Sequence, residues 1–458
     1  DARTFEIVSE TEEGWARFEV TTPCLVTVGE KIVKMRAPSP EARREAEGRP
    51  LTVRSLTELG LSAADVGLEG SLTVVRALRN DEPIRAKHIV NAGPVPERVR
   101  AAAARIRALW AGPQKPPAPP RTAPDRPPAL GEVLVFVSGP EGGVDPETLP
   151  MASEVLRLPE PLYPSAIGFG PITDQDRRGV LASGVVRTYW SHAPSGWRSP
   201  ETLAATVCEV LRTRTEASGA LFLSTSWSRE LAGRVSARMG LGLTGDAVSL
   251  AWEESAGLVF AKPSFGGGLL AEVVSKQRPS LGTIRPGSFA PASVERPRAT
   301  LDEVRKSLPE IKVRLSRTGS GVERDPRFGN LTSARVVVVL GMGVGGPDGV
   351  AEVVETIRPL EAALAATRKV VDAGWVPPQL QVGLTGRSVA PDLYLALGLS
   401  GKANHLVGAK RARVTVGINT KESEPLFSRV DVGVVGDWRE VLGPLVRELA
   451  EPEGRALG

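Results

Sequence analysis

The chain has 458 residues, of which 41% are hydrophobic and 24% are charged, and its formal net charge at pH 7 is +4. This length favours several domains, because one domain usually has roughly 100–200 residues. The small net charge and an aromatic content of only 5% disfavour a basic, aromatic-lined surface for nucleic acid.

Cysteine and histidine are too sparse for a metal cluster or a disulfide framework, since Cys24 and Cys208 are far apart and the three histidines are scattered. No apolar run approaches the roughly 18 residues that a membrane-spanning helix needs. The N-terminal residues do not form a basic leader followed by an apolar one. We therefore expect a cytoplasmic protein that does not span a membrane.

Composition and hydrophobic pattern divide the chain into four segments. The second contains eight prolines between residues 113 and 128, which predicts an extended spacer rather than helix or sheet. In the other three segments, apolar residues recur at the spacing of strands or of helices. The predicted segments are 1–110, 111–130, 131–295 and 296–458.

The first segment mixes strand and helix patterns. Residues 4–9 and 16–20 alternate as strands do, and residues 24–28 have the composition of a buried strand. A further strand is predicted over 72–77, and apolar residues at helical spacing predict a helix over 95–110.

Strands and helices alternate along the third segment, which predicts a doubly wound α/β domain on a parallel sheet. Residues 160–180 carry no readable period and are predicted to form a loop. The predicted elements are strands at 133–137, 220–224 and 258–261 and helices at 202–212 and 228–239.

The fourth segment is predicted to be a second doubly wound domain, with its first strand at 335–340 and its last at 432–435. The pattern of residues 380–419, between these two strands, predicts in chain order a strand, a glycine turn, a short helix, a second glycine turn, a second short helix and a strand. Turns at strand ends and helix starts lie along one crevice of an open α/β sheet, where backbone amides can hold a phosphate. Within this stretch the strands are predicted at 380–384 and 414–418, and the first helix starts at Pro391 and includes 393–397.

A glycine-rich turn, Gly341-Met342-Gly343-Val344-Gly345-Gly346, follows the first strand of this domain and satisfies the dinucleotide fingerprint. That fingerprint also requires an acidic residue about 20 residues later, at the end of a second strand. Residues 351–369 instead predict a helix, with a break at Pro359. An NAD-dependent oxidoreductase is therefore kept only as an alternative.

The same domain resembles the signature of the electron transfer flavoprotein α subunit. The resemblance extends with fixed gaps from Thr367 to Asn419, and motifs at 228–232, 242–246, 263–267 and 285–289 resemble the N-terminal domain of that subunit. In the C-terminal domain it is carried by Thr367-Arg368, residues 371–377 and 381–386, Leu393-Tyr394, Gly398-Leu399-Ser400-Gly401, Asn404-His405, Gly408 and Ile418-Asn419.

Residues 23–28, 55–61 and 66–71 resemble the C-terminal half of the β subunit of the same family. This resemblance implies a β-subunit tail fused in front of a complete α subunit. The loop matching the family's docking loop for partner dehydrogenases would be residues 37–45, where Ser39-Pro40 replaces an apolar anchor.

The resemblance implies that the C-terminal domain binds FAD. Arg368 would lie over the isoalloxazine ring, where a cation stabilises the negative charge of the reduced flavin. His405 would contact the flavin carbonyl between the ring nitrogens, and Thr385 the reactive nitrogen. Ser400 and Gly401 would hold the pyrophosphate at a helix start. The full set is Met342, Gly343, Thr367, Arg368, Gln381, Val382, Leu384, Thr385, Gly386, Ser388, Val389, Ala390, Ser400, Gly401, Asn404, His405, Asn419 and Asp437.

Other interpretations of these residues remain open. Without the resemblance, Arg368 would be interpreted as a solvated arginine on a helix. Asn419 and Asp437 are assigned to contacts with the adenosine end of FAD, and their alternative interpretation is that of turn residues. Three positions also depart from the family pattern, with Met342 in place of Arg, Leu384 in place of Gln and Asn404 in place of Gln. A flavin-free structural subunit of a redox complex is therefore a second alternative.

The resemblance implies an FAD-containing electron carrier rather than an enzyme with its own small-molecule substrate. The implied donors are flavin dehydrogenases, such as the acyl-CoA dehydrogenases of fatty acid β-oxidation, and the implied acceptor is a membrane quinone oxidoreductase. A separate β-subunit chain is a further expected partner, because the first half of that subunit has no match in the sequence.

Overall fold

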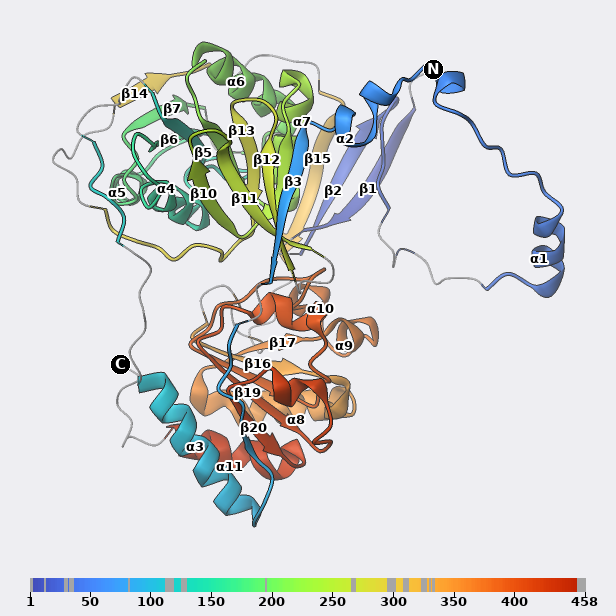
Figure 1. Cartoon of the computed structure of the whole chain (residues 1–458), viewed down its shortest axis with the longest axis vertical. Coiled ribbons are helices and arrows are strands. Elements are labelled where there is room, and N and C mark those ends of the chain that lie inside the picture. Colours follow the sequence, from blue (N-terminus) through green and yellow to red (C-terminus); the bar gives the residue numbers. More distant parts are fainter. Residues whose placement is uncertain are drawn as a thin grey trace.

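The structure is a computed structural model, and it contains two α/β domains, which lie one above the other in Figure 1. Each domain is built on its own parallel sheet, and two smaller antiparallel sheets lie beside the upper one. The described residues are 3–11, 14–28, 32, 37–80, 83–111, 119–124, 130–193, 196–264, 269–294, 302–307, 313–322, 328, 331 and 334–450.

The C-terminal domain has a six-stranded sheet of order β17-β16-β18-β19-β20-β4, in which every neighbouring pair is parallel. The central strands are short apolar runs buried on both faces, as expected where helices cover a parallel sheet. The prediction of a doubly wound domain is confirmed. The strands are β4 His88–Val90, β16 Val336–Leu340, β17 Ala363–Ala366, β18 Leu393–Leu397, β19 Val414–Asn419 and β20 Val432–Val435.

Two predictions within residues 380–419 are wrong. Leu393–Leu397 is the central strand β18, paired with β16 and β19, and not a helix. A run of five apolar residues has no period that separates a buried strand from a helix. Residues 380–384 do not form a strand either, since a 3-10 turn at Pro378–Leu380 is followed only by isolated bridges at Gln381 and Val382.

The region predicted as a helix over 351–369 contains both a helix and a strand. Helix α8, Pro347–Ile357, ends where Pro359 follows in a 3-10 turn, because proline cannot continue the hydrogen-bond ladder. The chain then forms β17, whose four residues are all small or apolar and buried. The second strand of the dinucleotide fingerprint is therefore present.

Part of the first segment belongs to the C-terminal domain. Strand β4 extends its sheet beside β20, and helix α3, Val95–Ala111, lies beside helix α11, Trp438–Ala450, at the bottom of Figure 1. The apolar face of α3 enters the same core as the strands, as its helical period predicts. Its buried residues are Val99, Ala102, Ala103, Ile106 and Trp110.

The N-terminal domain has a seven-stranded parallel sheet of order β14-β7-β6-β5-β8-β13-β9. Helices α4 Leu149–Val155, α5 Asp174–Ala182, α6 Pro200–Thr213 and α7 Ser226–Met239 connect its strands. The strands are β5 Glu132–Phe136, β6 Tyr163–Phe169, β7 Arg187–Ser191, β8 Gly219–Leu223, β9 Leu243–Ala247, β13 Ser280–Ile284 and β14 Asp302–Arg305.

The loop predicted over residues 160–180 is wrong, because β6 and α5 lie there. Strand β6 contains Pro164, Ser165 and Gly168, which hide its strand pattern, although all seven of its residues are buried. Ser165 tolerates burial because its hydroxyl donates to a carboxylate oxygen of Glu132 at 2.6 Å. Helix α5 buries only Val180, so it shows no apolar period.

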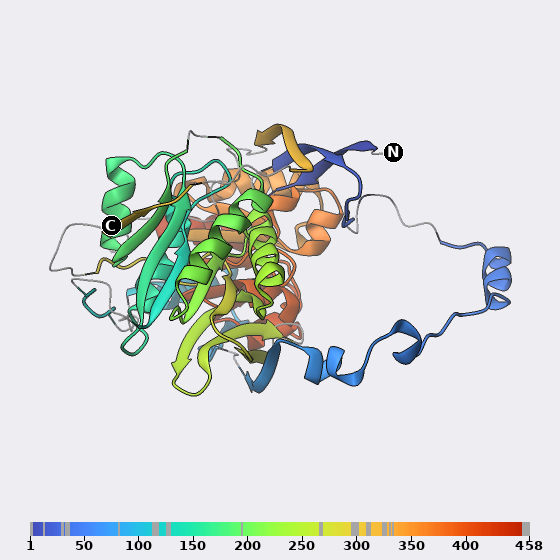
Figure 2. The same ribbon diagram turned by 90° about the horizontal axis from the view of Figure 1, so that it is seen from above.

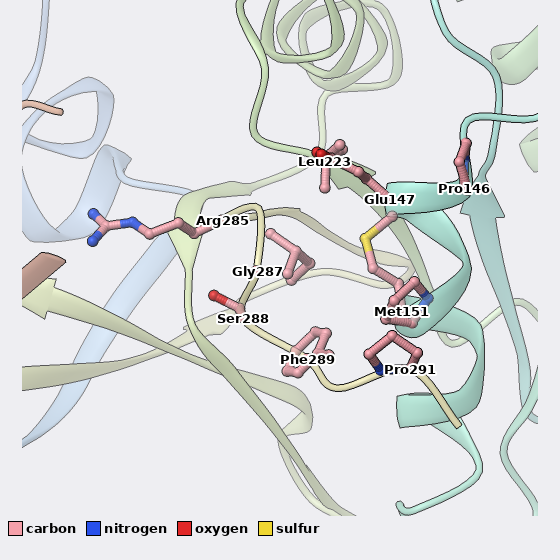
Figure 3. Close-up of a pocket in the computed structure, with 11 residues that line it drawn as sticks. Pro146, Glu147, Met151, Leu223, Arg285, Gly287, Ser288, Phe289 and Pro291 are labelled. Atoms are coloured by element: carbon pink, nitrogen blue, oxygen red, sulfur yellow. The ribbon is translucent and has the colours of Figure 1, made fainter. Parts of the chain in front are cut away.

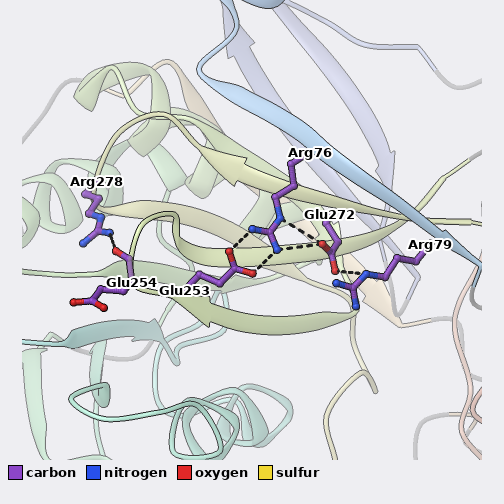
Figure 4. Close-up of polar contacts among 6 residues, drawn as sticks. All are labelled: Arg76, Arg79, Glu253, Glu254, Glu272 and Arg278. Carbon is purple, nitrogen blue, oxygen red and sulfur yellow. Dashed lines mark hydrogen bonds and ion pairs between the residues drawn. The ribbon is translucent and has the colours of Figure 1, made fainter.

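A four-stranded antiparallel sheet, β10-β11-β12-β3, joins the first segment to the N-terminal domain. Strand β3, Thr73–Asn80, pairs with β12, Leu269–Ser275, and the other strands are β10 Ser249–Glu253 and β11 Gly257–Ser264. Figure 4 shows Arg76 of β3 between the carboxylates of Glu253 and Glu272, with Arg79 also paired to Glu272. These pairs cross from one segment of the chain to another.

The start of the chain forms a further three-stranded sheet, in which β1 Thr4–Glu10 and β2 Gly14–Thr21 join β15 Leu315–Val322. The buried strand predicted over residues 24–28 is wrong, because these residues are exposed and have no regular structure. Helix α1, Pro40–Glu47, has no buried residue and lies apart from both domains in Figures 1 and 2.

Of residues 111–130, the structure describes 111, which ends helix α3, 119–124 and 130, and the other residues predicted as spacer lie outside the described ranges. Arg121 donates to the backbone oxygens of Leu158 and Leu162 at 2.9 and 2.8 Å. Ala123 is buried against the N-terminal domain, in a cluster with Tyr163 and Val186. This part of the segment is therefore held against that domain.

A buried ion pair ties the first segment to the C-terminal domain. Arg85 lies 3.1 Å from Asp431, and both side chains are about nine-tenths buried. The same carboxylate also accepts from the backbone of Ala86 and from Thr415.

We expect Arg85→Ala to lower the free energy of unfolding by about 3–5 kcal/mol, because a buried carboxylate loses its counter-ion. Urea unfolding followed by circular dichroism measures this change. The control Arg358→Ala removes an exposed pair with Glu355 and should cost less than about 1 kcal/mol. Equal effects of the two variants would contradict the role given to Arg85.

Candidate functional site

The candidate site lies at the edge of the C-terminal sheet where its parallel strands end. The order β17-β16-β18-β19 places β16 between β17 and β18, so the connection after β16 runs to one side of the sheet and the connection after β18 runs to the other. Open α/β sheets bind ligands in the crevice at such a switch point. Five strand ends bring predicted residues there, namely Met342 and Gly343, Thr367 and Arg368, Ser400 and Gly401, Asn419, and Asp437.

Two glycine turns meet backbone to backbone at this switch point. A Cβ on Gly341 would lie 2.3 Å from the carbonyl oxygen of Gly398, and one on Gly343 would lie 2.8 Å from the Cα of Gly398. Only glycine allows this approach. On the open side, Gly345 and Gly346 have φ of +94° and +148°, and no atom lies within 4 Å of the Cβ positions. This bare backbone cradle fits the pyrophosphate of a dinucleotide cofactor.

The turn over residues 381–389 lies beside the end of β17, because Gln381 bridges Ala366. The amide of Arg387 donates to Gln381 at 2.7 Å, and the amide of Val389 donates to Gly408 at 2.7 Å. The side-chain amide of Gln381 donates to the Thr385 hydroxyl at 2.9 Å. Leu384 bonds through its amide to the carbonyl of Asn404 at 2.7 Å, so the structure brings these two predicted regions into contact.

Exposure separates the predicted residues into three groups. Met342, Gly343, Arg368, Thr385, Ala390, Asn404 and Asp437 are exposed, whereas Val382, Val389 and Gly401 are buried. The remaining eight, Thr367, Gln381, Leu384, Gly386, Ser388, Ser400, His405 and Asn419, are partly buried. Most of the set is therefore accessible to a ligand in the crevice.

His405 is held by two protein groups. Its Nδ1 lies 2.9 Å from the carbonyl oxygen of Val382, and its Nε2 lies 2.5 Å from the hydroxyl of Tyr394. Because a carbonyl can only accept, Nδ1 carries the proton and the Tyr394 hydroxyl donates to Nε2. Burial lowers the pKa of His405 to about 4 and raises the pKa of the fully buried Tyr394. The imidazole is therefore neutral at pH 7.

Tyr394 was not predicted as a site residue. It appears in the sequence within the Leu393-Tyr394 motif, but no spacing rule relates its hydroxyl to His405. Because β18 was expected to be a helix, the tyrosine could not be placed beneath the histidine.

Arg368 is the first residue of the short helix α9, Arg368–Asp372, directly after β17 and Thr367. Its side chain is 47% exposed, and its Nε lies 3.4 Å from a carboxylate oxygen of Asp372. An exposed pair of this kind contributes little to stability.

Asn419 and Asp437 hold turns at the ends of β19 and β20. The Asn419 amide donates to the carbonyl of Leu399 at 3.0 Å, and its oxygen accepts from the amide of Lys421 at 2.9 Å. Asp437 accepts from the amide of Arg439 at 2.9 Å, at the start of α11. These contacts are the turn chemistry that the sequence left open as the alternative.

The turn after β18 leads into the short helix that the sequence predicted. Helix α10, Ala403–Leu406, has only four residues. Gly401 has φ of +72°, and a Cβ there would lie 2.3 Å from the Cα of Leu426, so this position also requires glycine.

The nicotinamide alternative lacks its recognition group. Although β17 supplies the second strand of the fingerprint, Thr367 and Arg368 follow it where the fingerprint places an acidic residue for the ribose hydroxyls. The glycine turn therefore matches the fingerprint only in its phosphate-binding part.

The N-terminal domain contains a separate cavity of about 270 Å³ at the ends of β8 and β13 (Figure 3). Met151, Leu223 and Phe289 contribute apolar surface, and Glu147 contributes a carboxylate. The guanidinium of Arg285 points away from the other lining residues in Figure 3 and pairs with Asp246. An apolar cavity with a carboxylate is poorly suited to a phosphate-bearing ligand.

Sequence comparisons match two regions of the chain to known families. Residues 330–410 match the family described as the electron transfer flavoprotein FAD-binding domain, and residues 133–309 match the electron transfer flavoprotein domain. The electron transfer flavoprotein subunit alpha of Thermoanaerobacterium thermosaccharolyticum is 35% identical over 50% of this chain and 70% of its own length. The chain belongs to the electron transfer flavoprotein α-subunit family.

Two further relatives extend the match. Protein FixB of Rhizobium meliloti is 30% identical over 67% of this chain and 89% of its own length. The LctC subunit of a lactate dehydrogenase (NAD(+),ferredoxin) from Acetobacterium woodii is 30% identical over 70% of this chain and 77% of its own length. As the family match places the FAD-binding domain at 330–410, the cofactor of this electron transfer flavoprotein is FAD.

The family matches begin at residue 133, so residues 1–132 lie outside both of them. The fused β-subunit segment is therefore not shown. No helix in the described ranges is long and apolar enough to cross a membrane. Likewise, the described residues contain no group of three or more His, Cys, Asp or Glu arranged to hold a metal ion.

The lowered pKa of His405 predicts a pH dependence of stability. Because the pKa of His405 is lowered to about 4 in the folded protein, the unfolded chain binds this proton more readily below about pH 6.5. The free energy of unfolding should therefore fall between pH 7 and pH 4, by up to about 3 kcal/mol from this group alone.

Urea unfolding at several pH values, compared between wild type and His405→Asn, isolates this contribution. The variant should show the shallower pH dependence. The control His88→Asn changes an exposed residue of β4 and should leave the wild-type dependence intact. Parallel curves for wild type and His405→Asn would contradict the assignment.

Proposed function

We propose that this chain carries the FAD of an electron transfer flavoprotein that accepts electrons from partner flavin dehydrogenases and passes them to a quinone-linked acceptor. The observation that carries the proposal is the glycine cradle formed by Gly341, Gly343 and Gly398 at the switch point, within the region matched to the FAD-binding domain. In this role the chain is an electron carrier and needs no small-molecule substrate of its own.

The residues around the crevice have separate tasks in this proposal. The glycine cradle and Gly401 bring backbone to the pyrophosphate, and Thr385 presents its hydroxyl from the 381–389 turn. Arg368 supplies the positive charge near the flavin, where bound FAD provides the redox chemistry. His405 contributes as a neutral, fixed group, because its pKa is lowered and Tyr394 holds its Nε2.

The three departures from the family pattern support a flavin site whose redox potential is altered. Met342 is 43% exposed at the open side of the cradle, where the family places an arginine, so one cation is missing there. The resulting proposal is a retained pocket with altered redox tuning. A flavin-free structural subunit is the alternative that the same three residues support.

We assign residues 1–110 to a β-subunit-like segment, 111–130 to a linker, 131–295 to an α-subunit N-terminal domain and 296–458 to the FAD domain. Exposed large apolar side chains concentrate in the first of these, and Leu25 is 95% exposed. Strand β1 also lies at a sheet edge. These features support the proposal that a separate β-subunit chain covers this segment and that residues 37–45 contact a dehydrogenase.

The partners themselves follow from family analogy. One relative bears the name of a lactate dehydrogenase subunit that uses NAD(+) and ferredoxin, and others are named electron transfer flavoprotein subunit alpha. For this chain we propose flavin dehydrogenases as donors and a membrane quinone oxidoreductase as acceptor.

The absorbance spectrum of the purified chain tests the proposal. We expect the bands of oxidised flavin, or their appearance after FAD is added to a colourless preparation. A chain that takes up no FAD, alone or with a β-type chain present, would overturn it. Binding of NAD instead of FAD would support the nicotinamide alternative.

We expect Arg368→Ala to make the midpoint potential of bound FAD more negative, because the reduced flavin loses a nearby positive charge. The expected shift is tens of millivolts, given that about 59 mV corresponds to a tenfold change for one electron. Spectroelectrochemical titration measures the potential, and Arg368→Lys serves as the charge-preserving control. The role of Arg368 is refuted if the alanine variant keeps the wild-type potential.

A further inference from the structure

One side chain of the N-terminal domain reaches the predicted flavin-binding turn of the C-terminal domain. Arg285 follows β13 and is about nine-tenths buried. Its Nη1 donates to the hydroxyl oxygen of Ser388 at 3.1 Å. Ser388 belongs to the turn over residues 381–389, and the contact therefore links the two domains.

Asp246 fixes the direction of the Arg285 side chain. The Nε of Arg285 lies 3.1 Å from each carboxylate oxygen of Asp246, and its Nη2 is also paired with that carboxylate. Asp246 is held in turn by the Thr283 hydroxyl, which accepts from its amide at 2.8 Å. Asp246 also has φ of +61°, a left-handed conformation uncommon for residues other than glycine. These contacts hold the guanidinium of Arg285 so that it points from the N-terminal domain towards Ser388.

The bond from Arg285 determines what Ser388 can offer to a ligand. A serine hydroxyl has one hydrogen to donate, and here its oxygen accepts from a guanidinium. The hydrogen therefore remains available for another acceptor, and a charged donor on the oxygen makes the hydroxyl a stronger donor itself. A flavin carbonyl or a phosphate oxygen would be a suitable acceptor.

We propose that Arg285 is a positioning residue for FAD: it fixes Ser388 so that the Ser388 hydroxyl donates to the cofactor, and it couples cofactor binding to the docking of the two domains. This inference rests on the proposed function for the identity of the ligand. The coupling follows from linkage, because a cofactor that binds the docked arrangement more tightly must also stabilise that docking.

A second interdomain contact supplies a matched control. Arg411 of the C-terminal domain donates to the carbonyl oxygens of Gly287 and Val248 in the N-terminal domain. It therefore contributes to the same interface without touching Ser388. Removing Arg411 should loosen docking, whereas removing Arg285 should also release the Ser388 hydroxyl.

A double-mutant cycle on the dissociation constant of FAD separates these effects. We expect Arg285→Ala and Ser388→Ala each to weaken FAD binding roughly tenfold, as for the loss of one charge-assisted hydrogen bond. The double variant should bind no more weakly than either single variant, because both changes remove one interaction. Ser388→Thr keeps a hydroxyl and should retain most of the affinity. Arg411→Ala combined with Ser388→Ala should be additive.

Additive losses for Arg285 and Ser388, or unchanged affinity in Arg285→Ala, would overturn the proposal. Arg285→Lys guards against misfolding, because lysine keeps the charge but cannot contact Asp246 and Ser388 together. It should bind FAD more weakly than wild type while remaining folded by circular dichroism. Wild-type affinity in this variant would also overturn the proposal.

Hydrogen exchange on the FAD-free protein gives a readout that does not depend on the cofactor. The amides of Arg387 and Val389 should lose protection in Arg285→Ala but keep it in Ser388→Thr. Unchanged protection in Arg285→Ala would contradict the positioning role. If the wild type binds no FAD, the proposed function fails, yet this exchange experiment still decides whether Arg285 holds the turn.

Discussion

The close backbone contact between the turns after β16 and β18 is the constraint on which the site depends. Gly341 and Gly343 lie against Gly398, and the backbone leaves no room for a side chain at any of these three positions. This contact can form only because β16 and β18 are adjacent parallel strands that end at the same edge. Fold topology and glycine chemistry together therefore create a bare surface for a phosphate-bearing cofactor.

Segments outside residues 296–458 support this edge. Strand β4 and helix α3 complete the sheet and its helical layer, although they precede β16 by more than two hundred residues. Arg285 of the N-terminal domain reaches Ser388, and Arg411 reaches back to Gly287. The ion pair of Arg85 with Asp431 anchors the β4 region. The crevice is thus assembled from distant segments of one chain.

The sequence predicted the two doubly wound domains and most of their long elements, because apolar runs and helical periods survive in isolation. It failed at Leu393–Leu397, whose five apolar residues suit a strand and a helix equally, and at β6, where proline and glycine mask a buried strand. The glycine turns at the strand ends could be predicted directly from the sequence. The contacts of His405 with Tyr394 and of Arg285 with Ser388 could not, because both depend on the packing of elements that no local pattern relates.

Titration of FAD into wild-type and Gly343→Val protein, followed by isothermal calorimetry, tests the central claim most directly. A valine at this position would push the two glycine turns apart, since even a Cβ would lie 2.8 Å from the Gly398 backbone. The account predicts saturation at one FAD per chain for the wild type and a severe loss of binding in a variant that circular dichroism shows to be folded. Equal affinity in the two proteins would show that FAD binds elsewhere and would contradict the account.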